Sequence, residues 1–275
     1  MTRRLATVLL GLCAAGFLAA PAFAQSPDNS PDSPAARESR WQDLEKTVFH
    51  GKTAAPSNGV VTLDAPNRAE DAALVPMTVT IKPADKVKAL WLIIDDNPMP
   101  VAAHIVFGPA ADPREMKFRV RVNDFTNVHA VAQLQDGSLV EDAKFVKASG
   151  GCSAPMGQSE GEALKGIGEM RLKFARPVQP GVPVEAKLML RHPNFNGMQM
   201  NQLTRLYTPA RYIDKVTVRD GDTKVFDMDS GISLAANPVL SFGLVPRSSG
   251  SLTVEVSDSS NTLWRRDFDI LRMTD

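Results

Sequence analysis

The sequence predicts an all-β protein made of two tandem immunoglobulin-like β-sandwich domains that follow a cleaved signal peptide. From residue 60 onward, apolar residues recur with a period of two in short segments, which is typical of half-buried strands. Turn sequences separate these segments, and no long helical pattern lies between them. Antiparallel sandwiches are therefore favoured over a parallel sheet.

Residues 1–24 have the layout of a secretion signal. Arg3 and Arg4 form a positive n-region, Leu5–Ala20 is apolar, and residues 22–24 read Ala-Phe-Ala, a signal-peptidase site. The apolar stretch is shorter than the roughly 20 residues that a membrane span needs. We therefore expect cleavage after Ala24, a periplasmic mature protein and no membrane span in that mature form.

The segment that follows changes character at Trp41. Residues 25–40 are rich in Ser, Pro and Asp, and this composition predicts a disordered leader. Between Trp41 and Phe49, apolar residues recur at the spacing of one helix face, which predicts a short amphipathic helix.

The first sandwich is predicted over residues 41–152. Seven candidate strands over about a hundred residues suit an immunoglobulin-like sandwich. Asp136-Gly137 is a strong hairpin turn between two of them. In one strand, Met116, Phe118, Val120 and Val122 alternate with the polar face formed by Lys117, Arg119 and Arg121. The candidate strands are 60–63, 77–81, 87–94, 101–107, 116–122, 128–134 and 139–146.

A second sandwich is predicted over residues 168–275. Residues 153–167 are small, Gly-rich and polar, and we interpret them as a linker. Asp220-Gly221 marks a hairpin between two strands of the second half. The candidate strands are 170–174, 184–190, 212–218, 224–228, 240–245, 252–256 and 263–270.

Cys152 is the one cysteine of the predicted mature chain, because Cys13 leaves with the signal peptide. Exported proteins usually pair their thiols, so an odd cysteine indicates intermolecular pairing or a reactive thiol. Gly150 and Gly151 precede it and Ser153 follows, and this predicts a thin, flexible arm with an accessible thiol. An inert linker cysteine is the alternative.

The remaining chemistry excludes several classes of function. The chain has 31 basic and 31 acidic residues, which argues against a nucleic-acid binder. The four histidines share no metal-ligand spacing, and no phosphate loop or nucleophile elbow is present. We predict no catalytic, cofactor-binding or metal site. One competing signal is soft sulfur near Cys152, from Met156, Met198 and Met200, which would suit Cu(I) although methionine more often fills core gaps.

Several motifs together resemble a known pair of proteins. In the first half these are Val75–Ile81, residues 96–100 (Asp-Asn-Pro-Met-Pro), Asp136-Gly137 and Gly150-Gly151-Cys152, which together resemble SoxY. In the second half, residues 191–197, 209–213 and 236–242 resemble its partner SoxZ. The whole chain from about residue 41 therefore resembles the fused SoxYZ-like carriers associated with quinoprotein dehydrogenases.

This resemblance implies a non-catalytic carrier in which Cys152 covalently holds a sulfur intermediate of thiosulfate or sulfur oxidation. The implied partners are periplasmic Sox-type or quinoprotein-associated redox enzymes. In SoxY the cysteine lies near a free C-terminal end, whereas here Ser153-Ala154-Pro155 follow and the arm is tethered at both ends. Two other hypotheses remain open: a copper or thiol-redox relay that uses Cys152 and nearby Met residues, and a structural tandem sandwich with an incidental thiol.

Overall fold

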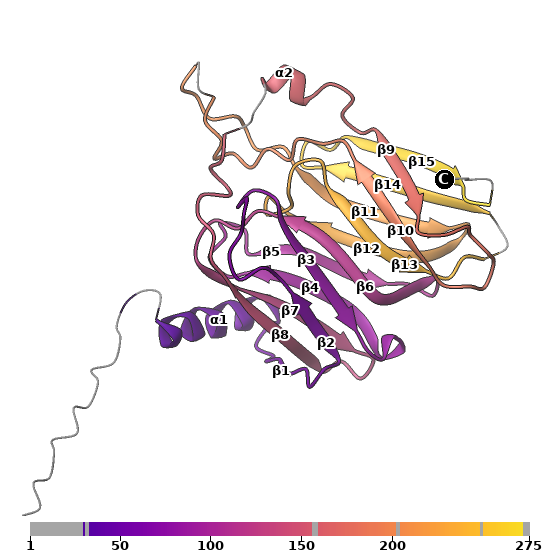
Figure 1. The fold of residues 1–275 in the computed structure, drawn as a ribbon, viewed down its shortest axis with the longest axis horizontal. Coiled ribbons are helices and arrows are strands. Elements are labelled where there is room, and N and C mark those ends of the chain that lie inside the picture. The colour runs from indigo at the N-terminus through magenta and orange to yellow at the C-terminus, as the bar shows by residue number, and fades with distance from the viewer. Residues whose placement is uncertain (1–29, 31–32, 156–158, 202–203, 248–249, 272–275) are drawn as a thin grey trace, which may run out of the picture.

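The computed structural model describes residues 30, 33–155, 159–201, 204–247 and 250–271, and strands dominate it (Figure 1). The predicted signal peptide lies outside these residues. The first half forms β1 (Ala55–Pro56), β2 (Val61–Asp64), β3 (Val75–Ile81), a 3-10 turn (Ala84–Lys86), β4 (Val87–Ile94), β5 (Val101–Phe107), β6 (Ala111–Val120), β7 (Thr126–Leu134) and β8 (Leu139–Val146). The second half forms β9 (Met170–Phe174), β10 (Val184–Leu190), β11 (Ile213–Asp220), β12 (Thr223–Ser230), β13 (Val239–Leu244), β14 (Ser251–Asp258) and β15 (Leu263–Asp269).

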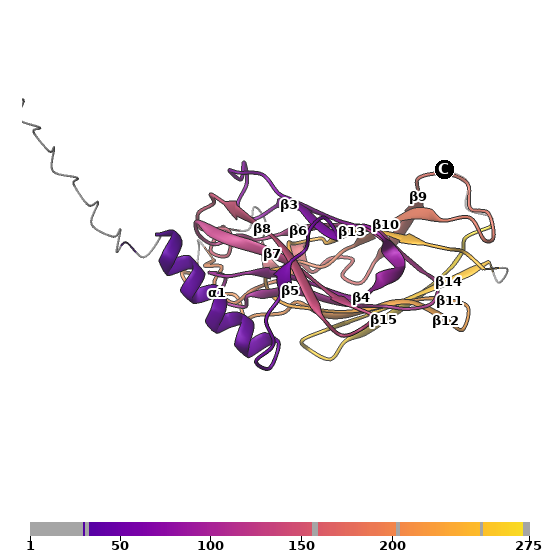
Figure 2. The same ribbon diagram turned by 90° about the horizontal axis from the view of Figure 1, so that it is seen from below.

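The strands form two sheets that stack face to face (Figure 2). One sheet has nine strands in the order β1-β8-β7-β4-β5-β12-β11-β14-β15, and the other has six in the order β2-β3-β6-β13-β10-β9. All pairs are antiparallel except β1 with β8. The all-β sandwich prediction is confirmed.

Both sheets run without interruption from the first half of the chain into the second. In the nine-stranded sheet β5 pairs with β12, with Phe107 opposite Phe226 and Ala103 opposite Ser230. In the six-stranded sheet β6 pairs with β13. The two sandwiches are thus joined edge to edge, and each half covers an edge that would otherwise expose unpaired backbone groups.

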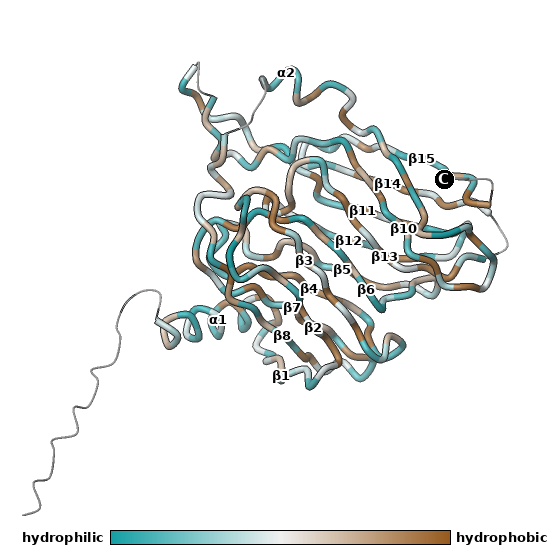
Figure 3. Tube along the Cα trace, in the orientation of Figure 1, coloured by the Kyte–Doolittle hydropathy of each residue, from teal (hydrophilic) through white to brown (hydrophobic). Residues whose placement is uncertain are grey.

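A single apolar core lies between the sheets and extends through both halves. It arises from the period-two pattern: in β3, Val75, Met77, Val79 and Ile81 are buried while the residues between them are more exposed. Figure 3 shows the corresponding alternation of hydrophobic and hydrophilic residues along the strands. Within the described residues no disulfide supports this core, because Cys152 is free.

A helix, α1 (Pro34–Val48), packs on the outer face of the nine-stranded sheet (Figure 2). It begins seven residues before Trp41, so the disordered leader predicted over residues 25–40 is wrong from Pro34 onward. The Ser33 side chain caps the helix by accepting from the Ala36 N–H, and Pro34 stands in the first turn. A Ser-Pro pair followed by polar residues suits both a helix start and a disordered segment, and composition alone favours the second.

The described part of the linker contains one short helix, α2 (Glu160–Ala163). In Figure 1 it lies beside the loop that connects β10 to β11. Among the described residues, no helix is long and apolar enough to cross a membrane.

Candidate functional site at Cys152

Cys152 lies just after β8, and its side chain is fully buried. The two preceding glycines hold the segment down through backbone hydrogen bonds. The Gly150 N–H donates to the Asn123 carbonyl at 2.7 Å, and the Gly151 N–H donates to the Val122 carbonyl at 3.2 Å. The segment is therefore docked along the residues that follow β6.

The second half of the chain holds the same segment from the other side. Asn196 donates from Nδ2 to the Cys152 carbonyl at 2.5 Å, and its Oδ1 accepts from the Met198 N–H at 3.0 Å. Asn196 is itself buried. Cys152 consequently lies where the two halves meet, and the motif at residues 191–197 bonds directly to its backbone carbonyl.

The accessible thiol that the sequence predicts is wrong for this conformation, and the glycines have a different role. A Cβ atom on Gly151 would lie 2.1 Å from the Ala72 carbonyl oxygen and 2.5 Å from that of Val122. Gly150 has a φ of 70°, which favours glycine. Small residues allow a segment to pack closely against its neighbours, and they also allow a flexible backbone. The sequence alone does not distinguish these two roles.

Arg121 is a buried cation that interacts with Cys152, and the sequence pattern placed it only on the polar face of a strand. Strand β6 ends at Val120, and Val120, Arg121 and Val122 are all buried, so the predicted alternation fails at this point. Its guanidinium Nη1 donates to the Ile232 carbonyl at 3.2 Å and to the Leu234 carbonyl at 2.6 Å. The period-two pattern continues to Val122, so it gives no sign that the strand ends at Val120 and that Arg121 turns into the interior.

The thiol and this guanidinium influence each other. Burial raises the pKa of Cys152, and the charge of Arg121 opposes part of that rise. Burial also lowers the pKa of Arg121 to about 10, with Cys152 acting in the opposite direction. The docked thiol is therefore held protonated, beside a cation that lacks an anionic partner among the described residues.

A buried asparagine from the first half ties this region together. Asn97 donates from Nδ2 to the Arg121 carbonyl at 2.7 Å and to the Ser233 hydroxyl at 2.9 Å, and its Oδ1 accepts from the Asn123 N–H. The Ser233 hydroxyl in turn donates to the Met99 carbonyl at 2.7 Å. The motif at residues 96–100 thus links the two halves of the chain beside Arg121.

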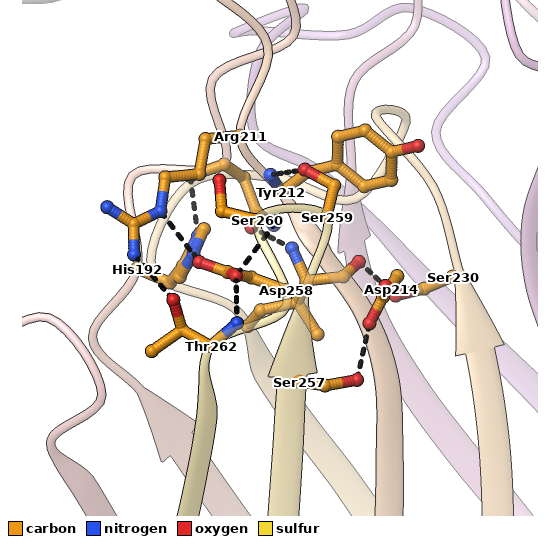
Figure 4. A network of polar contacts seen from close by, with 12 residues as sticks. His192, Arg211, Tyr212, Asp214, Ser230, Ser257, Asp258, Ser259, Ser260 and Thr262 are labelled. Atoms are coloured by element: carbon orange, nitrogen blue, oxygen red, sulfur yellow. Dashed lines mark hydrogen bonds and ion pairs between the residues drawn. The ribbon is translucent and has the colours of Figure 1, made fainter.

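The second-half motif rests on a buried polar network (Figure 4). His192 Nδ1 accepts from the Asn194 N–H at 3.0 Å, and its Nε2 lies 3.4 Å from Asp258 Oδ2. Arg211 donates from Nε to the same carboxylate oxygen at 2.7 Å. Burial lowers the pKa of His192, so the ring is neutral and donates to Asp258. This arrangement anchors the loop that carries Asn196.

Two of the other histidines pack against tryptophan rings. His104 stacks on Trp91, and His129 stacks on Trp41 beneath α1. Among the described residues, no group of three or more His, Cys, Asp or Glu could hold a metal ion. Met156, part of the copper hypothesis, lies outside those residues.

A cavity of about 430 Å³ opens beside the docked segment. Residues of both halves line it, among them Asp71, Arg121, Ala154, Pro155 and Gln199. Ala154 and Pro155 come two and three residues after Cys152, so the cavity adjoins the segment that carries the thiol.

Each half of the chain matches the model of a known protein family. Residues 45–152 match the model of "Sulfur oxidation protein SoxY", and residues 171–269 match that of "Sulphur oxidation protein SoxZ". The chain is thus a two-part sulfur-oxidation protein. It belongs to the fused SoxYZ-like carriers, with the SoxY domain first, as the sequence motifs predict.

Solved structures give more distant likenesses. The sulfur carrier protein SoxY from Chlorobium limicola f thiosulfatophilum is 25% identical, with a TM-score of 0.36, and the match covers 42% of this chain and 96% of that one. A superoxide reductase from Ignicoccus hospitalis is 14% identical, with a TM-score of 0.29, and the match covers 32% and 78%. A search of curated proteins found no match.

Proposed function

We propose that this chain is a periplasmic carrier that holds a sulfur-containing group covalently on Cys152 and presents it to partner redox enzymes. The observation that carries the proposal is the end point of the SoxY match, which is Cys152 itself. This residue is also the free thiol of the described chain.

The docked thiol represents a resting position. Its burial excludes reagents, and a raised pKa leaves little of the nucleophilic thiolate. Loading therefore requires the segment around Gly150 and Gly151 to detach from its docked position. Because the chain continues into the second half, the released segment presents the thiol on a loop rather than on a free tail.

Two balanced reactions could load the thiol. In an oxidative route, the Cys152 thiol and thiosulfate form a Cys–S–S–SO₃⁻ disulfide, releasing one proton and two electrons to an acceptor on a partner redox protein. In an exchange route, the Cys152 thiolate attacks tetrathionate, forming the same disulfide and releasing thiosulfate. The second route needs no enzyme and gives a direct test.

Intact-mass analysis of the purified chain after exposure to tetrathionate tests the carrier role. We expect one S-thiosulfonate per chain, removed by excess thiol reductant and absent from Cys152→Ser. The stronger form of the test adds thiosulfate and a periplasmic extract of the native host. A wild-type thiol that stays unmodified in both settings, or adducts that persist in the serine variant, would contradict the proposal.

Export and partner choice need their own tests. N-terminal sequencing of protein from the periplasmic fraction should give a chain that begins at Gln25; a chain that begins at Met1 would contradict export. Co-purification from that fraction should bring down Sox-type or quinoprotein-associated redox enzymes with the wild type, and the adduct found on Cys152 identifies the cargo.

A further inference from the structure

We infer that the cavity beside Cys152 is an oxyanion site, in which Arg121 holds the sulfonate end of the group carried on the cysteine. The inference rests on the proposed carrier function, but it concerns a separate binding interaction that does not need the covalent bond.

Arg121 is a buried cation with unused donors. It is 1% exposed, and it lines the cavity. Among the described residues, both hydrogen bonds of its guanidinium come from Nη1, and its buried Nε has no partner. A guanidinium has five N–H donors arranged to grip an oxyanion, so the Nε and Nη2 donors remain for a ligand.

Gln199 is a second buried and unsatisfied polar group in the same cavity. It is 5% exposed, and its Oε1 has no hydrogen-bond partner in the part of the chain that the structure describes. A side-chain amide can turn its NH₂ group toward an anion. Buried polar atoms are normally paired, so two orphans in one cavity, one from each half of the chain, indicate a missing polar ligand.

The charge balance specifies an anion. A buried cation is costly without a counter-charge, and the docked thiol supplies none because its pKa is raised. Asp71 lines the cavity as well, but it is exposed, and its Oδ1 already accepts from the Ala73 N–H at 2.8 Å. A sulfonate attached through Cys152 would bring the absent charge to Arg121, whereas a neutral adduct would not.

Free oxyanion binding tests the site without covalent chemistry. Calorimetric titration of Cys152→Ser with thiosulfate, and separately with sulfate, should show one site per chain. Adding Arg121→Met should weaken binding about ten- to a hundredfold, the range for losing hydrogen bonds to a charged group. Arg119→Met is the matched control, because Arg119 lies two residues earlier, near the end of β6, and is exposed; it should bind as the parent does.

Two further variants keep the test decisive if Arg121→Met does not fold. Gln199→Met removes a polar group whose oxygen has no partner, so it should fold and bind several-fold more weakly. Asp71→Asn should bind more tightly, because it removes a negative charge from the cavity. Binding that is unchanged in Gln199→Met and Asp71→Asn would overturn the inference.

Loaded protein tests the link to the cargo. Wild type carrying Cys–S–S–SO₃⁻ should melt at a higher temperature than wild type carrying Cys–S–S–CH₃ from a methylthiolating reagent, since the adducts differ mainly in the sulfonate. This difference should shrink in Arg121→Lys, which keeps the charge but not the two-pronged hydrogen bonding of the guanidinium, and persist in Arg119→Met. Loading without any such difference would leave the carrier function standing and refute the oxyanion site. If the protein binds free oxyanions but Cys152 is never modified, the oxyanion site stands and the carrier function is refuted.

Discussion

Gly150 and Gly151 are under different constraints in the docked segment. Gly150 needs its left-handed backbone, while Gly151 needs the absence of a side chain because two carbonyl oxygens approach it. The second constraint makes the resting position sensitive to a single methyl group. It also separates docking of the thiol from the chemistry of the thiol.

Gly151→Ala should release the thiol without removing it. The added Cβ would overlap the Ala72 and Val122 carbonyl oxygens, and such overpacking costs about 1–3 kcal/mol. We expect Cys152 to be alkylated roughly ten- to a hundredfold faster in the folded variant than in the wild type. Ser153→Ala is the control, because it removes only an exposed hydrogen bond to the Gly150 carbonyl. Equal rates in Gly151→Ala and wild type would show that Gly151 does not hold the segment in place.

Sequence reasoning identified the cysteine but not its surroundings. An odd thiol between glycines is visible in the sequence, and the motifs on either side support it. Its burial depends on Val122, Asn196 and Arg121, which lie 30, 44 and 31 positions from Cys152 in the sequence. Nothing local indicates such contacts, so the docked state and the cavity emerge only once the two halves are placed together.

At the scale of elements, α1 is held on the sheet by an aromatic stack and a buried charge cluster. Trp41 stacks on His129 with ring centroids 3.6 Å apart and donates to Glu141 at 3.2 Å. His129 lies between two carboxylates, 2.8 Å from Glu141 and 3.3 Å from Asp95. The sequence predicted the helix from its apolar spacing, whereas this polar contact surface comes from two other strands and a turn.

Docking of α1 should weaken as pH rises. Burial lowers the pKa of His129, but the interactions with the Asp95 and Glu141 carboxylates outweigh it and raise the pKa to about 9. A folded pKa above the ordinary 6.5 means that this stabilisation is complete below 6.5 and is lost as pH rises through about 9. Deprotonation also removes the positive charge beside Asp95, a carboxyl whose own pKa is raised by burial.

Hydrogen exchange of the α1 peptide, corrected for the intrinsic effect of pH, measures this change. Protection should fall at least several-fold between pH below 6.5 and pH above 9. His129→Asn removes the titrating ring and should show no such step, with weaker protection throughout. Constant corrected protection in the wild type would mean that His129 does not control the helix.

At the scale of the whole molecule, the two halves share both sheets and one core. The strands themselves follow from the period-two pattern, and several, such as Val87–Ile94 and Val184–Leu190, match the predicted bounds. Edge pairing between halves leaves no such signal, because any strand edge offers the same backbone groups. The sequence pattern is therefore the same for two separate sandwich domains and for two halves whose sheets are joined through paired strands.

The boundary between the halves carries two close-packed glycines, Gly243 in β13 and Gly108 directly after β5, and replacing either should weaken the association of the halves. A Cβ on Gly108 would lie 2.4 Å from the Lys224 carbonyl oxygen, and one on Gly243 would lie 2.4 Å from that of Asp112. We expect fragments 30–157 and 158–275, mixed after separate expression, to form a complex on gel filtration. Gly243→Ala should lower the affinity between the fragments at least tenfold, because the added atom pushes the paired strands β6 and β13 apart.

Gly161→Ala is the control for this experiment, since open space surrounds that position. Unmixed monomers from the wild-type fragments, or full affinity in Gly243→Ala, would show that these pairings do not hold the halves together.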